Sequence, residues 1–415
     1  MPVEILIQIA KWIAQDELTL PETRGTLSDL RYSTNNGELR RYRPWSFFFH
    51  DLFNTDLLGS SAQPPKRRNR SILSLSLTCV RICRACVAAL YHDVVVHCSN
   101  HQKLNIFLDT ITKNESAYLQ KYVTRLAVTY NWYIRPDTWK FDSTQSIQDT
   151  IASGAVRLPV LRSLYITKSD FGHWRKLLPT LPALECLTLK DVELPDRDFP
   201  VLPRLKTAHF CHCSVNFTLG EFLIRHPSLR ELVNICTFDR TSRNMFEPVR
   251  DTLESLVWVA SAAHDWNFYD ERPDITYLRQ LRHLATRTWI FTHNFDWGAT
   301  LWEEEEDLVC MESLETVEVI TSGFHRGLLR ESPPLIFRKI VETLKNAKKK
   351  RGFKSLRVVD LRSFEKWQFC SLHWKIMKDG FLDAAMREYK QLGIVLLLPE
   401  IGRGTYHPQC NSTWL

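Results

Sequence analysis

Glycine is scarce in this chain, with 14 residues among 415. Loops that wrap nucleotides or phosphates depend on glycine, because the backbone must approach the ligand closely. The sequence contains no phosphate-binding Gly-x4-Gly-Lys-Ser/Thr, no hydrolase Gly-x-Ser-x-Gly and no zinc-protease His-Glu-x2-His. It therefore carries none of these enzyme signatures, and we expect a protein without catalytic residues or a cofactor of its own.

Long apolar runs and a strong charge of one sign are also missing. No stretch reaches the roughly 18 apolar residues that a membrane helix needs. The start of the chain, residues 1–4, has no basic segment typical of a secretory signal. The formal charge of +7 is small for this length and favours neither nucleic acid nor a membrane as partner. With an odd number of cysteines, 11, the chain is expected to hold reduced thiols in the cytoplasm and/or the nucleus.

The chain does contain one recurring apolar motif, Leu-x-x-Leu-x-Leu, which we call the leucine phrase. The cleanest copies occupy residues 161–166 and 184–189. Looser copies begin at Val123, Leu205, Leu229, Leu253, Leu281, Leu314 and Leu356. A repeat at roughly 20–30 residues is typical of a solenoid, in which each unit buries its apolar face against its neighbours.

Each phrase predicts a strand, because side chains alternate between the two faces of a strand. The second and third leucines are expected to point into the core. Pro159, Pro182, Pro203 and Pro227 stand just before four of the phrases and are expected to end the preceding element, so that each strand starts from a fixed break. The pattern predicts an α/β fold with a curved parallel sheet over residues 98–415.

Three further elements are predicted around these phrases. Residues 94–96 favour a strand, and the apolar run at 394–398 favours a buried strand. Residues 334–344 form an amphipathic pattern that leads into the basic run 345–351, which is typical of a helix with positive residues in its last turn. A nuclear localisation signal is the alternative interpretation of that basic run.

The residues just before, between and just after the two inward leucines are expected to form a target-binding face. Its middle is apolar and its surroundings are polar, a composition that suits protein recognition. The alternative is that a loop or the C-terminal tail covers this strip. The residues predicted for this face are Tyr165, Lys190, His209, Val233, Ile235, Val257, Val259 and Arg287.

The N-terminal segment contains two apolar blocks. Apolar residues at 5, 6, 9, 12 and 13 follow helical spacing after Pro2 and Glu4. The second block, residues 72–91, is helical in pattern and contains Leu75, Ser76, Leu77, Cys79, Arg81 and Arg84 before Leu90-Tyr91. Together the two blocks resemble the F-box, which begins Leu-Pro-x-Glu-Ile-Leu and continues with a Leu-Ser-Leu-Val-Cys-basic stretch.

This chain departs from the F-box pattern in two ways. Met1 stands where the first Leu is usual, and an insertion at 15–70 separates the two blocks. The aromatic middle of the insertion, residues 42–53, is expected to fold as a short helix against the N-terminal block, with a partner-docking patch as the alternative. A long loop adds only about 1–2 kcal/mol, since closure entropy grows with the logarithm of length.

The Leu-Pro-x-Leu phrases are similar to the irregular leucine-rich repeats of fungal F-box proteins. The resemblance implies an F-box at 1–97 and a leucine-rich-repeat solenoid with a C-terminal cap at 98–415. It also implies the substrate-recognition subunit of an SCF-type ubiquitin ligase, which binds a Skp-type adaptor and, through it, a cullin, while the repeats bind an unknown target protein. The adaptor-binding residues so implied are Pro2, Ile5, Leu6, Ile9, Leu75, Leu77 and Cys79.

Two alternatives to this interpretation are a non-ligase repeat scaffold with a degenerate F-box and an iron–sulfur protein. The second rests on the Cys-x3-Cys-x2-Cys spacing of Cys79, Cys83 and Cys86, which resembles radical S-adenosylmethionine enzymes. Ala85 stands where that family has an aromatic residue, so buried structural cysteines are favoured. A zinc site formed by residues 211–213 with Cys236 is not expected, because adjacent residues of a strand point to opposite faces.

Overall fold

The computed structural model describes seventeen segments, which divide into two compact units. Described residues up to 235 belong to the first unit and those from 242 onward to the second. The segments are 86–87, 91–98, 102–113, 117–130, 157–167, 172–175, 177–194, 199–215, 218–235, 242, 244–259, 274–275, 278–287, 311–320, 333–349, 353–361 and 381–398.

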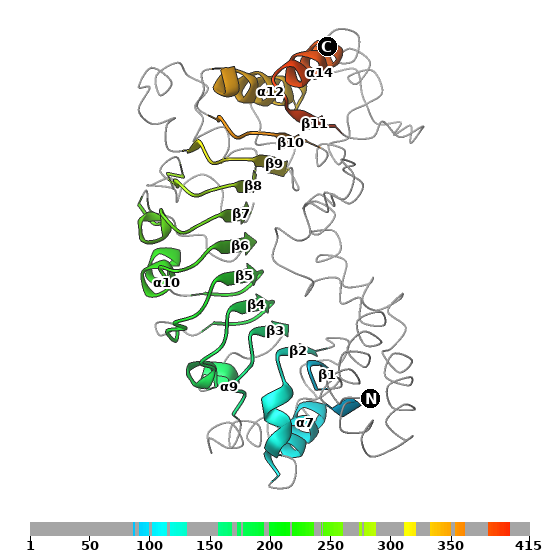
Figure 1. Ribbon diagram of the computed structural model, residues 1–415, viewed down its shortest axis with the longest axis vertical. Coiled ribbons are helices and arrows are strands. Elements are labelled where there is room, and N and C mark those ends of the chain that lie inside the picture. The colour runs from blue at the N-terminus through cyan, green and yellow to red at the C-terminus, as the bar shows by residue number, and fades with distance from the viewer. Residues whose placement is uncertain are drawn as a thin grey trace, which may run out of the picture. The chain divides into compact units, whose positions relative to one another are not determined.

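The first unit is built on six strands that pair in chain order, every one parallel to its neighbour. The strands are β1 (Asp93–Cys98), β2 (Arg125–Tyr130), β3 (Ser163–Thr167), β4 (Cys186–Lys190), β5 (Thr207–Cys211) and β6 (Glu231–Ile235). Its helices are α7 (Gln102–Thr112), η3 (Ala117–Tyr122), α9 (Gly172–Arg175), η5 (Leu178–Thr180) and α10 (Leu219–Arg225). Helix α7 packs beside β1 (Figure 1). The predicted domain boundary after residue 97 falls inside β1.

The second unit repeats this arrangement with five parallel strands in chain order. They are β7 (Ser255–Val259), β8 (His283–Arg287), β9 (Thr316–Ile320), β10 (Val358–Asp360) and β11 (Val395–Leu397), with the helices η6 (Glu247–Val249), α12 (Pro333–Lys349) and α14 (Asp383–Gln391). The predicted α/β class with a parallel sheet is confirmed, and the sheet is not closed.

Every copy of the leucine phrase leads into a strand, including those at Leu314 and Leu356 where the spacing lengthens. Equivalent positions pair across strands, so that Leu164 lies opposite Leu187 and Ala208 lies opposite Leu232. All four side chains are 0% exposed. Complete burial of one leucine contributes about 1.5–3 kcal/mol, and the ladder of such residues confirms the predicted inward direction.

A tight turn of the same kind precedes β3, β4, β5, β6, β8, β9 and β10. The N–H of Leu161 donates to the carbonyl of Leu158 at 3.1 Å, and the N–H of Leu205 donates to that of Leu202 at 3.0 Å. Proline follows the first residue of both turns, where its fixed φ suits the second position of a turn. The break predicted at the four prolines is therefore a hydrogen-bonded turn with proline at its second position, before β3, β4, β5 and β6.

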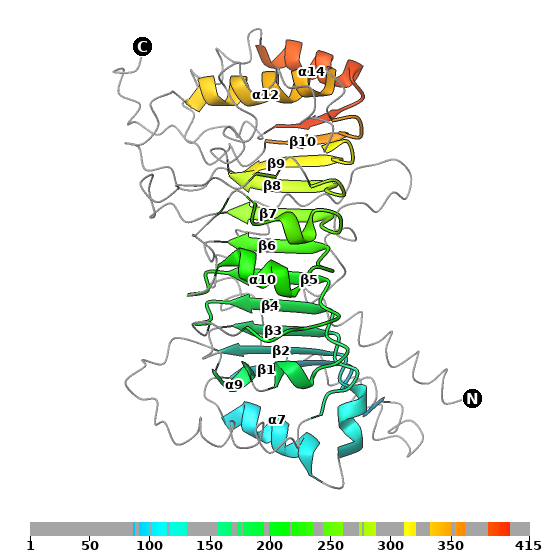
Figure 2. The same cartoon turned by 90° about the vertical axis from the view of Figure 1, so that its left-hand side faces the viewer.

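The leucine side of the first unit faces its helices, and α9 and α10 lie on that one side of the strands (Figure 2). Phe210 of β5 meets Phe222 of α10 edge to face, with ring centres 5.0 Å apart. Phe199 completes the cluster at 5.3 Å from Phe222. Helix α10 begins at a capping box, in which the Thr218 hydroxyl accepts from the N–H of Glu221 while the Glu221 carboxylate accepts from the N–H of Thr218.

His226 occupies the turn position that holds leucine in the preceding repeats. It is 1% exposed and stacks on Phe222 at 4.3 Å. Its Nδ1–H donates to the carbonyl of Phe222 at 2.8 Å, and its Nε2 accepts from the N–H of Leu202 at 3.2 Å. Because Nε2 accepts, the ring is neutral, and burial lowers the pKa of His226.

The buried neutral ring predicts a pH dependence of stability. Below the unfolded-state pKa of about 6.5, the unfolded chain takes up a proton that the folded ring refuses, so stability is full above that pH and falls as the pH drops toward the lowered folded pKa. Thermal unfolding between pH 8 and pH 5 measures the slope. We expect His226→Leu, which restores the leucine of other repeats, to flatten it, and an equally steep profile in that variant would contradict the assignment.

The second unit ends in two helices and an edge strand. Helix α12 spans the predicted helix and carries Lys348 and Lys349 in its last turn, as expected. The run at 394–398 forms β11, but it pairs only with β10 among the described strands, and Val395 is 38% exposed. Ile394 is buried, but residues 396–398 are only partly buried. The predicted burial of this strand is therefore wrong, because β11 is the last of the described strands in the order. Within the described segments no helix has the length and apolarity to cross a membrane.

Candidate binding face

The residues implied for adaptor binding all lie outside the described segments. They are Pro2, Ile5, Leu6, Ile9, Leu75, Leu77 and Cys79. Their role stays a prediction, and the candidate site that can be built from the structure is the face of the strands opposite the leucine ladder.

Side chains on this face align in rows, because the strands pair in register. One row of the first unit begins each strand and runs through Asp93, Arg125, Ser163, Cys186, Thr207 and Glu231. The next row contains Tyr165, Thr188, His209 and Val233, and a third contains Thr167, Lys190, Cys211 and Ile235. The predicted target-binding residues of the first unit thus share two adjacent rows, as equivalent positions of the phrase should.

The predicted exposure of this face is not found. Val233 and Ile235 are 2% and 1% exposed, and Val257 and Val259 of the second unit are 0% and 2% exposed. Tyr165 and Lys190 are also buried, whereas His209 is half-buried. The side chain of Arg287 lies outside the described part. The expectation of an exposed apolar strip is therefore wrong for these residues, while their role in target binding stays a prediction.

A polar cluster crosses three strands of the first unit on this face. His209 of β5 lies between Thr188 of β4, with its Nδ1 3.3 Å from the hydroxyl oxygen, and Glu231 of β6, with its Nε2 3.0 Å from a carboxylate oxygen. The Glu231 side chain is 6% exposed and that of His209 is 20% exposed. Nε2–H donation to the carboxylate leaves Nδ1 to accept from the Thr188 hydroxyl, so the imidazole orientation is fixed on both sides.

Cys186 lies beside this cluster but is not activated as a nucleophile. Burial and the negative charge of Glu231 raise the pKa of its thiol to about 11, against the opposing effect of hydrogen bonds with Ser163 and Thr188. A reactive cysteine needs a lowered pKa, because the thiolate is the nucleophile. The chemistry supported at this place is hydrogen bonding rather than covalent catalysis.

Charges at the start of β1 and β2 pair with each other. The Asp93 carboxylate lies 3.0 Å from Nδ1 of His92 and 3.6 Å from Nε of Arg125. Beside them, Ser163 and Tyr165 line a small depression with room for about one water molecule. A small-molecule substrate does not fit there, so this part of the face offers polar contacts and no substrate pocket.

The second unit carries comparable polar residues in two rows. Nδ1 of His283 lies 2.7 Å from the hydroxyl of Thr316 on the neighbouring strand. Glu318 and Asp360 occupy paired positions of β9 and β10 and are 2% and 0% exposed. These four residues lie at positions of the phrase equivalent to those of the predicted face. Aligning the phrases position by position is the signal that could have found the cross-strand neighbours.

The cysteine-based alternatives fall mainly outside the described residues. Cys79, Cys83 and Cys236 are not described, and Cys86 is buried. The Cys213 thiol donates to the carbonyl of Leu189 at 3.3 Å. Within the described segments no three His, Cys, Asp or Glu side chains gather in a metal-binding arrangement.

Comparison with known proteins adds no assignment to this geometry. No protein-family model matches the chain, and no curated protein matches it significantly. The class of protein defined by the structure is an α/β protein with open, parallel sheets built from a repeated leucine phrase.

Proposed function

We propose that this chain is the substrate-recognition subunit of an SCF-type ubiquitin ligase, with an F-box in residues 1–97 and a leucine-rich-repeat solenoid in residues 98–415. The observation that carries the proposal is the in-register stacking of the leucine phrase. It supports the repeat half of the resemblance, and repeat arrays serve as extended protein-binding surfaces.

In this role the chain brings the target close to the ubiquitin-transfer machinery and catalyses no step itself. The two N-terminal blocks of the F-box pattern dock on the Skp-type adaptor, which a cullin holds. The repeats hold the target at high effective concentration beside the transfer machinery. The raised pKa of Cys186 and the absence of a substrate-sized pocket beside Ser163 are compatible with a binding role in the described part. A protein target is favoured over nucleic acid because the net charge of +7 is small for this length.

A charge in the N-terminal apolar helix tests the proposal. Leu6→Asp is expected to weaken binding to a purified Skp-type adaptor at least about 100-fold, because an unpaired carboxylate would be buried in an apolar interface. Lys11→Asp, at a polar position of the same helix pattern, is the matched control and should bind normally. Co-purification measures the effect, and thermal unfolding checks that the repeats stay folded. Retention of the adaptor by Leu6→Asp would reject this docking surface.

A second candidate is a repeat scaffold that binds proteins without joining a ligase. The insertion at 15–70, which separates the two blocks of the F-box pattern, favours it. Co-purification of the adaptor with the unmodified chain distinguishes the two candidate functions, because the scaffold hypothesis expects no adaptor to co-purify.

A further inference from the structure

In the first unit, the residue just before a strand uses its main-chain carbonyl to accept two N–H groups from the next repeat, and these carbonyls form a regular column. The carbonyl of Arg162 accepts from the N–H groups of Glu185 and Cys186 at 2.9 and 2.8 Å. The carbonyl of Glu185 accepts from Lys206 and Thr207 in the same way, at 2.8 and 3.0 Å, and the carbonyl of Lys206 accepts from Arg230 and Glu231, at 2.8 and 3.0 Å. This pattern places Arg162, Glu185, Lys206 and Arg230, which we name the edge column, at equivalent positions of successive repeats.

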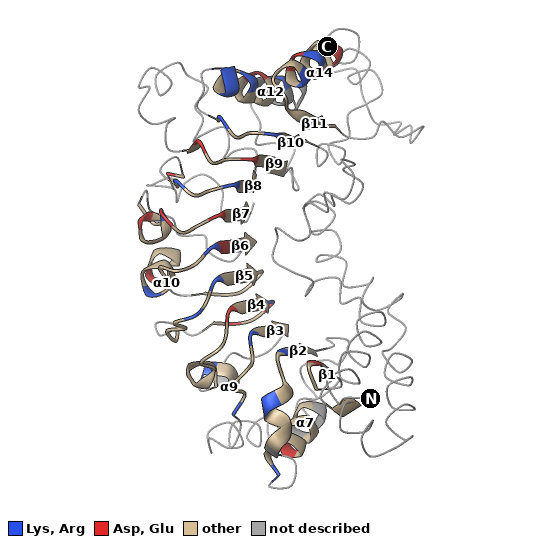
Figure 3. Cartoon of the chain, in the orientation of Figure 1, with Lys and Arg blue, Asp and Glu red and all other residues tan. Residues whose placement is uncertain are grey.

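The edge column is predominantly positive and faces solvent. Arg162, Lys206 and Arg230 are exposed, as is Arg204 in the turn just before Lys206. Glu185 is the only acidic member of the column and lies 3.5 Å from the Lys206 ammonium. Figure 3 shows the basic residues where the chain enters β3, β5 and β6. Arg230 has a further interaction of its own, and the three cations Arg162, Arg204 and Lys206 against the one anion Glu185 still give this edge a net positive field.

The second unit shows that the architecture does not require this charge excess. There the carbonyls of Glu254, Arg282 and Glu315 each accept two N–H groups from the next repeat, between 2.7 and 3.1 Å. The corresponding column, which ends at Arg357, alternates in sign, and Arg282 lies 4.0 Å from Glu315. The same backbone therefore tolerates a balanced column, and the positive edge of the first unit calls for a reason beyond folding.

We propose that the edge column and Arg204 form a docking edge for an acidic, extended peptide segment of a partner protein. Neighbouring strands lie about 4.8 Å apart, so the column spans about 14 Å, close to the roughly 13 Å between the ends of five extended residues. Arginine forks and a lysine ammonium both bind carboxylates, with arginine doing so in pairs of hydrogen bonds. Aromatic side chains, on which single-stranded nucleic acid stacks, are missing from these five residues.

This inference rests on the proposed target-binding function and names the chemistry of the target. The probe is a fluorescein-labelled peptide with five consecutive glutamates, and its anisotropy is followed with the full chain at about 50 mM salt. The triple variant Arg162→Glu, Arg204→Glu and Lys206→Glu is expected to weaken binding at least about tenfold. The matched control is Arg282→Glu with Arg357→Glu in the second unit, which should bind within about twofold of the unmodified chain.

Three results would overturn the inference. The first is a control variant that loses as much affinity as the triple variant. The second is a glutamine peptide that binds as well as the glutamate peptide. The third is a single-stranded oligonucleotide that binds more tightly than the peptide and no longer binds the triple variant. The last would assign the edge to nucleic acid. Since these substitutions are exposed, thermal unfolding should be unchanged, and the neutral triple variant to glutamine should show an intermediate loss.

Adaptor co-purification separates this inference from the proposed function. The triple variant should retain the Skp-type adaptor, because its three positions lie outside the F-box pattern. If the unmodified chain binds the adaptor but not the glutamate peptide, only the docking edge is rejected. If it binds the peptide but not the adaptor, the ligase role is rejected and the docking edge stands.

Discussion

Phe222→Ala is expected to lower the free energy of unfolding of the first unit by about 3–5 kcal/mol, because it removes a fully buried ring from the core. Phe222 is 0% exposed and contacts Phe199, Phe210 and His226 with ring centres between 4.3 and 5.3 Å apart. Its loss would detach α10 from β5 and leave a cavity beside His226.

Ile224→Ala is the matched control, since Ile224 lies on the same helix and is 67% exposed. It should change stability by no more than about 0.5 kcal/mol. Denaturant unfolding compares the two variants, and amide hydrogen exchange of β4, β5 and β6 localises the effect to the first unit. Equal stability of Phe222→Ala and Ile224→Ala would contradict the packing described for α10.

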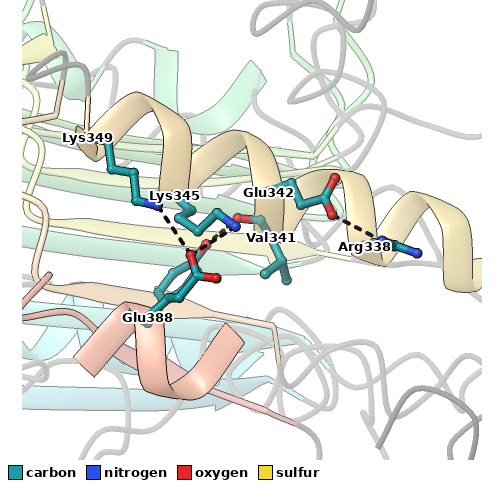
Figure 4. Close-up of polar contacts among 7 residues, drawn as sticks. Arg338, Val341, Glu342, Lys345, Lys349 and Glu388 are labelled. Carbon is teal, nitrogen blue, oxygen red and sulfur yellow. Dashed lines mark hydrogen bonds and ion pairs between the residues drawn. The ribbon is translucent and has the colours of Figure 1, made fainter. Parts of the chain in front are cut away.

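Tyr389→Ala is expected to release α14 from α12 at a cost of about 3–5 kcal/mol, comparable with the loss of other fully buried aromatic rings. Tyr389 is 0% exposed, and its hydroxyl donates to the carbonyl of Val341 on α12 at 2.7 Å (Figure 4). Burial raises the pKa of Tyr389 far above its usual range, so the hydroxyl remains a donor at any ordinary pH. Limited proteolysis of α14 and thermal unfolding measure the result.

Two further variants divide this effect into its parts. Tyr389→Phe keeps the ring and leaves the Val341 carbonyl without this donor, which should cost about 1–2 kcal/mol. Glu388→Ala removes a carboxylate that bridges Lys345 at 3.0 Å and Lys349 at 3.3 Å on the surface, with little expected change in stability (Figure 4). A larger loss in Glu388→Ala than in Tyr389→Ala would show that surface charge, and not the buried ring, joins the helices.

Local pattern was sufficient to predict the strands. The alternation of leucines within one phrase decides which side chains face the core, and that decision involves only neighbours in sequence. Proline before the phrase likewise sets the turn locally. For this reason the strands at Leu314 and Leu356 follow the phrase even though the spacing between repeats had lengthened.

Contacts between repeats do not follow from any one phrase, because they appear only when several phrases are aligned with one another. His209 is an ordinary polar residue in the sequence until the register brings Thr188 and Glu231 to its two sides. His226 replaces a leucine without any sign in the sequence that Leu202 will donate a hydrogen bond to it. Such pairings depend on the register between neighbouring strands, which are connected by loops of different lengths.

The amino-acid sequence by itself determined the repeated strand, its inward face and the turn that begins it, since each follows from the side-chain geometry of a few consecutive residues. Only the tertiary structure decided the burial of Val233 and Val257, the exposure of Val395 and the alignment of Arg162, Lys206 and Arg230 along one edge. These features depend on which distant segments become neighbours. The free energy of packing between repeats decides which segments do so, and the local sequence pattern does not.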